Sequence, residues 1–392
     1  MTPYAIFPER IFTPQREIRD GVVIVEGGRI SAVGARDEIA VPASAKRIEA
    51  RGITLIPGFV DVHIHGAGGH DVMEATPVAL DAVATTLARG GTTSFLATTV
   101  TAAPDVLCAS AAGIAKFISK QAPDESGTAA SPRAEILGIH FEGPFINPTR
   151  RGVHPVEWIA APSLALFARM TEAAAGTARI LTLAPEIPGG IELVDAARKA
   201  GIVAALGHTD ATYEQAMDAI AHGARHAAHV FNAMRPFSHR DTGVLGAVLT
   251  SPQVTAELIA DGVHVDEAAM KLLLAAKPEK VILVSDGTAA TGMPDGKYRL
   301  GNFDVQVTGG VVRNSEGKLA GSALTLDRAL RNIVALGIPL DEAVCMLTHY
   351  PAQLLGLESR KGVIAPGADA DLVFLDSNLE ISKVVTRGAG FN

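Results

Sequence analysis

Short apolar runs recur through the middle of the chain, and more polar segments with helical periodicity separate them. Eight such runs stand out, at residues 54–65, 91–99, 134–143, 179–186, 202–209, 226–233, 255–262 and 280–287. Near-continuous apolar runs are typical of parallel strands that are covered on both faces. In residues 211–223 the apolar side chains instead form one helical stripe that ends before Gly223. The alternation predicts an α/β fold, a (β/α)₈ TIM-type barrel, with an open doubly wound sheet as the alternative.

Both ends of the chain have a different pattern, which is typical of β-structure. Residues 21–34 give two β-branched strands joined by a Gly-Gly pair, a hairpin signal. Residues 361–376 also consist of turns and strands. Because chain termini often lie close together, we expect the ends, 1–56 and 361–392, to form one small β-sandwich domain. The barrel would then be a catalytic domain of residues 57–360 inserted between them.

Two segments interrupt the alternation of strands and helices. Residues 121–133, QAPDESGTAASPR, predict a mobile loop. Residues 298–321 predict a β-hairpin inserted late in the barrel.

Composition narrows the classes of function. The chain has 392 residues and a formal net charge of −8, which argues against general binding to nucleic acid or to an anionic membrane. An anionic substrate would therefore need a local cationic pocket. Cys108 and Cys345 match no metal or redox spacing and suggest a reducing compartment. With no signal peptide pattern and no apolar run near the ~18–20 residues of a membrane span, we expect a cytoplasmic protein.

Polar residues suited to chemistry gather at the carboxyl ends of the predicted strands. They are His63, His65, His140, Glu142, His208, His229, Asn232, Asp261, His264 and Asp286. In a barrel these strand ends surround one mouth, where barrel active sites are found. His63 and His65 are two residues apart on one strand, so their rings face the same space. Imidazoles and carboxylates without thiolates suit one or two divalent cations, zinc or iron above all.

Such a site would carry out hydrolysis. A divalent cation lowers the pKa of bound water towards about 7 and polarises a carbonyl oxygen. A neighbouring carboxylate accepts the proton of the water and passes it to a leaving group. Asp286 is the natural proton shuttle, because the histidines and Glu142 already have ligand roles. Amides and esters are the substrates that this chemistry indicates.

Each of these residues also has an ordinary structural interpretation. A lone histidine at a strand end is usually hydrogen-bonded or solvated, and an aspartate there often forms a turn or a helix cap. We expect no ligand role for five further histidines, which are His70, His222, His226, His239 and His349. The convergence of several strand ends, and not the His-x-His pair alone, favours a metal site.

Six motifs together resemble a known family. They are PGFVDVHIHG, HFEGPFINPTRRGVHP, LGHTDATYEQA, HVFNAM, DGVHV and VSDG. From about residue 20 to about residue 375 the chain resembles the N-acetylglucosamine-6-phosphate deacetylases of the amidohydrolase superfamily. The resemblance implies hydrolysis of N-acetylglucosamine 6-phosphate to glucosamine 6-phosphate and acetate.

The resemblance also implies roles for individual residues. Glu142, His208 and His229 would bind the main metal, Asp286 would be the catalytic acid and base, and His154 would help to polarise the acetyl carbonyl. Substrate contacts would fall on Val153, Asn232, Ala233, Asp261, His264, Leu319, Ala320 and Gly321. The sugar phosphate would meet His264 and Arg240, with Arg240 reaching across from the partner subunit of a homodimer.

Members of the family differ at the His-x-His positions. Those that lack both histidines use one metal, and those that keep both can hold a second ion. This chain keeps His63 and His65, so the resemblance implies a site for two ions with Glu142 as the bridge. No lysine ends the third or fourth run, which agrees with a glutamate-based site.

Two alternatives stay open at this point. One is a deacetylase of N-acetylgalactosamine 6-phosphate or of another N-acyl amino sugar phosphate, since one inverted hydroxyl depends on a few contacts. The other is a barrel that has lost catalysis and serves as a scaffold. A scaffold should have broken ligands, whereas here every position of the set is filled.

Overall fold

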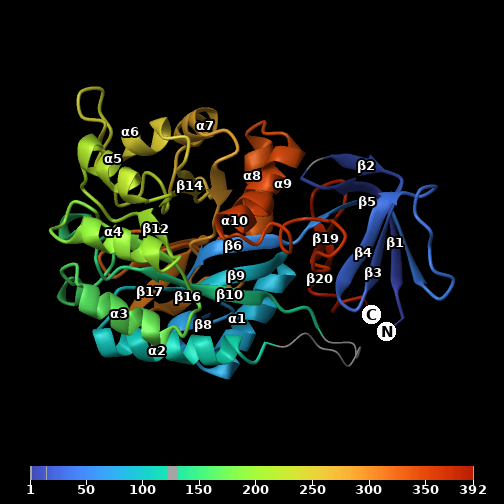
Figure 1. Ribbon diagram of the computed structural model, residues 1–392, viewed down its shortest axis with the longest axis horizontal. Coiled ribbons are helices and arrows are strands. Elements are labelled where there is room, and N and C mark those ends of the chain that lie inside the picture. The colour runs from blue at the N-terminus through green and yellow to red at the C-terminus, as the bar shows by residue number, and fades with distance from the viewer. Residues whose placement is uncertain (1, 15, 122–130, 392) are drawn as a thin grey trace.

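A closed barrel of parallel strands forms the larger part of the molecule. The computed structural model describes residues 2–14, 16–121 and 131–391, so most of the predicted mobile loop, 121–133, lies outside the described residues. Within them, one sheet has eight parallel strands in chain order (Figure 1). They are β6 (Phe59–Ile64), β9 (Thr92–Thr99), β10 (Glu135–Glu142), β11 (Ala178–Leu183), β12 (Val203–Leu206), β13 (His226–Ala227), β14 (Thr255–Leu258) and β15 (Val281–Leu283).

The first and last strands meet at their carboxyl ends and close the barrel. Ile64 and Gly287 form an isolated parallel bridge. The backbone N–H of His65 donates to the carbonyl of Gly287 at 2.7 Å, and that of Asp286 donates to the carbonyl of His63 at 2.9 Å. The predicted (β/α)₈ barrel is confirmed, and the open doubly wound sheet is wrong.

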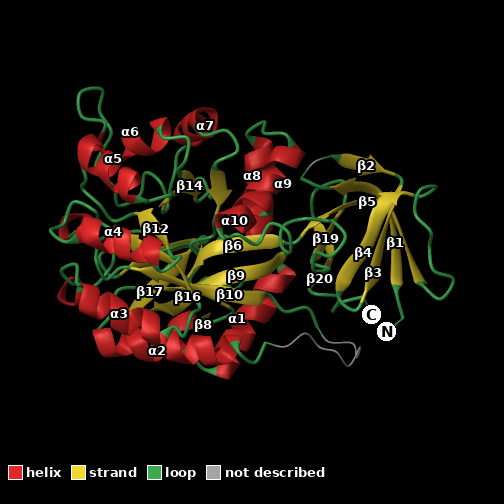
Figure 2. Ribbon diagram, viewed as in Figure 1, coloured by secondary structure: helices red, strands yellow, loops and turns green. Residues whose placement is uncertain are grey.

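Helices cover the outside of the barrel (Figure 2). They are α1 (Pro77–Arg89), α2 (Pro104–Ile118), α3 (Leu164–Ala173), α4 (Gly190–Lys199), α5 (Tyr213–His222), α6 (Gly243–Thr250), α7 (Glu267–Ala276), α8 (Leu326–Ala335), α9 (Leu340–Leu347) and α10 (His349–Leu354). The helix predicted within 211–223 is α5. Thr212 and Gln215 form a capping box at its start, and Gly223 ends it. None of the described helices is long and apolar enough to cross a bilayer.

A second sheet draws its strands from both ends of the chain. They are β1 (Tyr4–Phe12), β2 (Glu17–Arg19), β3 (Gly21–Glu26), β4 (Arg29–Ala35), β5 (Lys46–Pro57), β19 (Leu372–Leu375) and β20 (Ile381–Val385). Gly27 and Gly28, at φ 57° and 78°, make the tight turn between β3 and β4. β19 pairs antiparallel with β5, so the predicted β-rich unit from both chain ends is confirmed. The exact domain boundaries, 1–56, 57–360 and 361–392, stay a prediction.

Two predicted elements differ in detail. The apolar run 54–65 is two strands in different sheets, β5 and β6, separated by Gly58. The predicted hairpin at 298–321 is a three-stranded antiparallel sheet. Its strands are β16 (Gly296–Leu300), β17 (Phe303–Thr308) and β18 (Val311–Asn314). A smaller ribbon of β7 (Gly66–Ala67) and β8 (His70–Asp71) follows β6.

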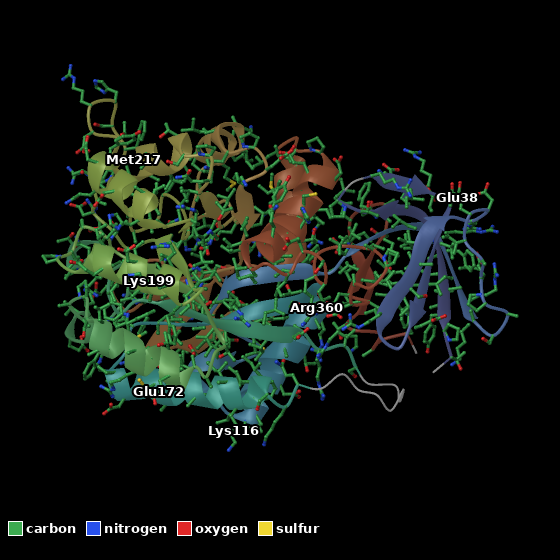
Figure 3. The ribbon with its side chains drawn as sticks, viewed as in Figure 1. Glu38, Lys116, Glu172, Lys199, Met217 and Arg360 are labelled. Carbon is green, nitrogen blue, oxygen red and sulfur yellow. The ribbon has the colours of Figure 1, made fainter. Side chains whose placement is uncertain are left out.

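A buried ionic cluster joins the barrel to the end sheet. Nζ of Lys361 lies 2.6 Å from Oε2 of Glu135, 2.9 Å from Oδ2 of Asp369 and 2.7 Å from Oδ2 of Asp371. Arg360, which Figure 3 places between the two parts, approaches Oδ2 of Asp369 at 3.0 Å. Glu135 is the first residue of the barrel strand β10, and the two aspartates lie just before β19 of the end sheet. The cluster therefore links a barrel strand to the end sheet.

Candidate active site and metal centre

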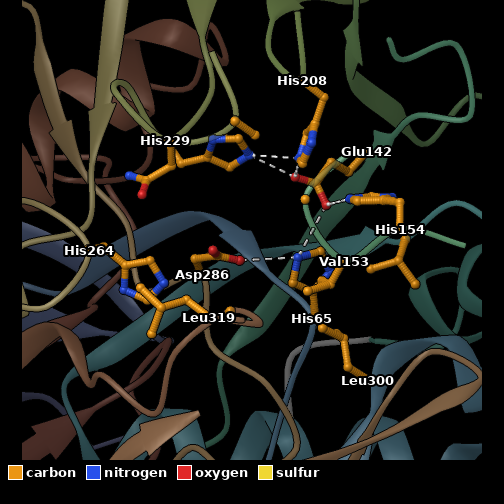
Figure 4. A pocket seen from close by; sticks show the side chains of 15 residues that line it. His65, Glu142, Val153, His154, His208, His229, His264, Asp286, Leu300 and Leu319 are labelled. Atoms are coloured by element: carbon orange, nitrogen blue, oxygen red, sulfur yellow. Dashed lines mark hydrogen bonds and ion pairs between the residues drawn. The ribbon is translucent and has the colours of Figure 1, made fainter. Parts of the chain in front are cut away.

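A cavity opens at the carboxyl ends of the barrel strands, and most of the predicted site residues line it. Those on its wall are His65, Glu142, Val153, His154, His208, His229, Asn232, Ala233, His264, Asp286, Leu319 and Gly321 (Figure 4). Val100, Gly152 and Leu300 complete the wall. The side chains suited to chemistry are therefore gathered where barrel enzymes place their active sites.

The first cluster consists of Glu142, His208 and His229. Oε1 of Glu142 lies 3.0 Å from Nε2 of His208 and 2.9 Å from Nε2 of His229, and the two ring nitrogens are 3.1 Å apart (Figure 4). Nδ1 of His208 donates to the carbonyl of Arg150 at 2.9 Å, so the neutral ring turns a lone pair towards the others. A carboxylate oxygen and two imidazole nitrogens this close share either a proton or a cation. The spacing suits a cation at 2.0–2.2 Å from each ligand atom.

The second cluster consists of the His-x-His pair and Asp286. Oδ1 of Asp286 lies 3.2 Å from Nε2 of His65 and 3.8 Å from Nε2 of His63. Nδ1 of His65 donates to the carbonyl of Thr98 at 3.0 Å, which leaves its Nε2 facing the cluster. Nε2 of His63 is buried and has no hydrogen-bond partner among the described residues. A buried ring nitrogen without a hydrogen-bond partner is suited to bind a cation.

Glu142 stands between the two clusters. Its Oε1 is 3.4 Å from Nε2 of His63, and its Oε2 is 3.5 Å from Nε2 of His65. One carboxylate therefore reaches the nitrogen atoms of both groups, as a bridging ligand must. The side chains present, imidazoles and carboxylates, fit a divalent metal.

Backbone conformation explains how these side chains reach one mouth. His208 and His229 follow the short strands β12 and β13 with φ of 48° and 27°, and Asp286 follows β15 with φ of 48°. Left-handed backbone is uncommon for residues with a side chain, and such residues cluster at functional sites. At each of these three residues the chain turns just after its strand, and the side chain lies on the cavity wall.

His154 approaches Glu142 from a loop that precedes η3 (Val156–Trp158). The backbone N–H of Thr101 donates to Nδ1 of His154 at 3.2 Å, which leaves Nε2 as the nitrogen that can donate. That nitrogen lies 3.1 Å from Oε2 of Glu142 (Figure 4). His154 thus presents an N–H donor to the centre of the site, as the polarisation of a carbonyl oxygen requires.

Burial and charge together set the protonation of the cluster. Burial raises the pKa of Glu142, but the charges of His154 and His63 and the hydrogen bonds of the imidazoles lower it well below its usual range. Burial lowers the pKa of His208 to about 4, helped by the charge of His154. Burial also lowers the pKa of His229, but the hydrogen bond and charge of Glu142 outweigh it and leave that pKa raised. The carboxylate is ionised, and a cation that binds here displaces protons from imidazole.

His140 ends a strand as predicted but has no free ligand atom. Its Nδ1 donates to the carbonyl of Val62 at 2.9 Å, and its Nε2 lies 2.7 Å from Oγ1 of Thr182. Burial lowers its pKa to about 3, so the ring is neutral and both of its nitrogens are occupied. His140 therefore supports the wall of the barrel from behind the metal cluster.

The predicted substrate contacts differ in where they lie. Oδ2 of Asp261 holds Nδ1 of His264 at 2.7 Å, which orients that ring at the cavity wall. Ala320 is absent from the cavity wall; it is fully buried in an apolar cluster that includes Val305 and Val312 of the three-stranded sheet. Arg240 is exposed in the loop between β13 and α6 and is also absent from the cavity wall.

Glu257 is a buried site residue that the sequence analysis missed. It lies in β14, and its carboxylate contacts His63, His226 and the backbone of His229. A single glutamate inside the apolar run 255–262 was the signal that could have found it. The remaining histidines agree with the ordinary interpretation, since His70 pairs with Glu74 and none of the five lines the cavity.

Comparison with known proteins places this geometry in a family. The model of the amidohydrolase family matches residues 54–390. The chain belongs to the amidohydrolase family. The resemblance predicted from the motifs is thereby confirmed. This amidohydrolase is an enzyme, and its buried histidines and carboxylates can hold a divalent metal.

Several relatives match this amidohydrolase along its whole length. An N-acetylglucosamine-6-phosphate deacetylase of Bacillus subtilis (strain 168) is 38% identical, covering 96% of this chain and 94% of the relative. An N-acetylgalactosamine-6-phosphate deacetylase of Escherichia coli O157:H7 is 36% identical, covering 97% of each chain.

Solved structures of N-acetylglucosamine-6-phosphate deacetylases also match this chain along its whole length. A variant of N-acetyl-D-glucosamine-6-phosphate deacetylase from Mycobacterium smegmatis, in complex with N-acetyl-D-glucosamine-6-phosphate, has a TM-score of 0.90 and 36% identity, covering 100% of this chain and 99% of that one. The enzyme from Pasteurella multocida has a TM-score of 0.91 and 31% identity, covering 99% of each chain.

Proposed function

We propose that the protein is a metal-dependent deacetylase that converts N-acetylglucosamine 6-phosphate to glucosamine 6-phosphate and acetate. The observation that carries the proposal is the meeting of Glu142, His208 and His229 with Asp286 and His154 around one cavity. Relatives named for this activity match the chain along its whole length. Hydrolysis of an acetamide needs a bound cation, a proton acceptor and an N–H donor close together, and these residues would supply all three.

In this proposal each group has one task. Glu142, His208 and His229 would hold the main ion, zinc or iron, and His63 and His65 would hold a second. The metal would supply activation of a water molecule and of the acetyl carbonyl. Asp286 accepts the proton of the attacking water at Oδ1 and delivers it to the departing sugar amine. His154 donates its Nε2–H to the carbonyl oxygen as charge develops there.

The substrate would lie along the wall formed by Val153, Asn232, Ala233, Leu319 and Gly321, with Ala320 packed behind it. His264, oriented by Asp261, would face the sugar phosphate. Arg240 is exposed and outside the cavity of its own chain, so it would serve the phosphate from the partner subunit of a homodimer. A cytoplasmic location fits the two free cysteines, Cys108 and Cys345.

Acetate release tests the activity. Metal-depleted and metal-reconstituted protein would be given N-acetylglucosamine 6-phosphate and unphosphorylated N-acetylglucosamine, with bound metal counted per chain. We expect turnover that requires metal and strongly prefers the phosphorylated sugar. Absence of turnover in fully metallated protein would overturn the proposed substrate.

The galactosamine epimer is the second candidate, because the relative from Escherichia coli O157:H7 is named for it. Both phosphorylated epimers would be compared in one assay by kcat/KM. A higher kcat/KM for N-acetylgalactosamine 6-phosphate would transfer the assignment to that substrate.

Mixed dimers test the role of Arg240. Arg240→Ala and Asp286→Asn subunits are each inactive by expectation, and a mixed dimer restores one intact site if Arg240 acts across the interface. Random mixing would then recover roughly a quarter of wild-type activity, since half of the dimers are mixed and each has one working site. No recovery, with mixed dimers demonstrated by mass, would place Arg240 in its own subunit's site, whereas full activity of Arg240→Ala alone would place it in neither.

A further inference from the structure

Glu257 is a carboxylate buried behind the His-x-His pair, and both of its oxygens are fully engaged. Oε2 lies 2.8 Å from Nδ1 of His63 and accepts the backbone N–H of His229, also at 2.8 Å. Oε1 lies 2.8 Å from Nε2 of His226. The side chain has no exposed surface. Three donors, one from His63 in β6 and two from the segment 226–229, therefore converge on one anion.

These contacts fix which nitrogen of His63 carries the proton. An ionised carboxylate only accepts hydrogen bonds, so Nδ1 of His63 must be the donor towards Glu257. In the neutral form that a bound cation requires, the lone pair of the ring is therefore on Nε2. That atom points at two further carboxylates, at 3.4 Å from Oε1 of Glu142 and 3.8 Å from Oδ1 of Asp286. It has no hydrogen-bond partner among the residues that the structure describes.

The two histidines of the pair are held in different ways. His65 donates its Nδ1–H to the backbone carbonyl of Thr98, an acceptor that no side-chain substitution removes. The Nδ1–H of His63 donates instead to a side chain, the carboxylate of Glu257. An anionic acceptor also makes the opposite nitrogen a stronger ligand than a neutral carbonyl does. Of the two rings, His63 is thus the one whose ligand quality a single substitution can change.

We propose that Glu257 is a positioning residue that makes His63 a ligand of a second cation. The proposal rests on the proposed function, in which His63 and His65 hold that ion. Glu257 does not line the cavity, and it acts through the tautomer and orientation of His63. Its bond to the backbone of His229 also steadies the turn that carries a ligand of the main ion.

The test is metal binding by the full-length Glu257→Gln variant. Glutamine keeps the shape of the side chain and one acceptor oxygen but removes the charge. Bound Zn²⁺ per chain would be measured across a buffered metal series, and Co²⁺-loaded protein would be compared by its visible absorption. We expect the main ion to be retained and the affinity for the second ion to fall about 10- to 100-fold.

Two further variants separate positioning from a structural effect. If Glu257 acts through His63, Glu257→Gln should add no further loss of the second ion to a protein that already has His63→Gln. Thr255→Val is the matched control, because it removes the hydroxyl partner of His226 and leaves Glu257 in place. We expect it to bind two ions as the wild type does.

Three results would overturn the proposal: a second ion bound by Glu257→Gln with wild-type affinity, equal loss of both ions, or a wild type that never binds more than one. Turnover of the wild type separates this outcome from that of the proposed function. A one-ion wild type that releases acetate keeps the deacetylase and rejects the role of Glu257. A wild type that binds two ions but has no turnover, and whose Glu257→Gln variant binds the second ion more weakly, keeps the role of Glu257 and rejects the deacetylase.

Discussion

At the scale of single residues, Asp286 has the geometry of a proton shuttle. Its backbone N–H donates to the carbonyl of His63, and its Oδ1 lies 3.2 Å from Nε2 of His65. Burial raises its pKa, but the hydrogen bond of His65 and the charge of His63 outweigh burial and leave that pKa lowered. The carboxylate is therefore ready to accept a proton at neutral pH.

Asp286→Asn should remove catalysis and keep the main metal. Asparagine has a similar size but accepts no proton, so we expect kcat to fall about 10²- to 10⁴-fold. Glu142, His208 and His229 are unchanged, so the main ion should stay bound. Acetate release and metal content would be measured on the same sample.

Asp261→Asn is the matched control for that variant. It changes a carboxylate outside the cavity wall that orients His264 on the wall. We expect a higher KM for the phosphorylated sugar and a smaller change in kcat. If Asp286→Asn retained turnover within tenfold of the wild type, another group would have to move the proton.

The sequence predicts which residues meet at the mouth, because parallel strands in a barrel end on one side. His63 and His65 face one space as expected, and Glu142 lies within reach of both. Glu257 escaped prediction because it lies deeper in its strand than the strand-end positions that were searched. Arg240 lies outside the cavity of its own chain, and its role across a subunit interface stays a prediction.

At the scale of elements, periodicity predicts burial but not the partner of a strand. The apolar run 54–65 is buried along most of its length, so nothing in its hydrophobic pattern marks the passage from the end sheet to the barrel. The mark is Gly58, a residue without a side chain between β5 and β6. In the same way, alternation within 298–321 predicts β-structure and leaves open whether two or three strands form.

Gly58→Ala should destabilise the passage between the two sheets. An added Cβ would lie 2.1 Å from Oγ1 and 2.3 Å from Cγ2 of Thr93, and a buried strand has little room to move. We expect unfolding to require about 1–3 kcal/mol less free energy, as for other overpacked cores. Urea unfolding would measure the change.

Gly90→Ala is the matched control, because its added Cβ would meet nothing nearer than 3.5 Å. We expect a clearly smaller change for that variant. Equal stability of Gly58→Ala and the wild type would show that Thr93 gives way easily and that Gly58 is not needed for the passage.

At the scale of the whole molecule, the ionic cluster around Lys361 links the two parts, and its acid sensitivity follows from Glu135. Burial raises the pKa of Glu135, but the charge of Lys361 and the hydrogen bonds of Arg360 and Lys361 outweigh it and bring that pKa to about 2. Burial raises the pKa of Asp371 instead, against the opposing charge of Lys361. The two carboxylates therefore respond to acid in opposite directions, and a variant is needed to separate them.

Glu135→Gln isolates the contribution of Glu135 to stability. A carboxylate whose folded pKa lies below the unfolded value of 4.5 stabilises the fold above pH 4.5, and this stability is lost as pH falls towards 2. The difference between these values corresponds to about 3 kcal/mol. We expect the variant to be less stable than the wild type at pH 6, with the gap narrowing as pH falls from about 4.5. Exposed Glu172, changed to Gln as a control, should leave stability unchanged at each pH. A gap that stayed constant from pH 6 to pH 3 would show that Glu135 acts through its shape and not through its charge.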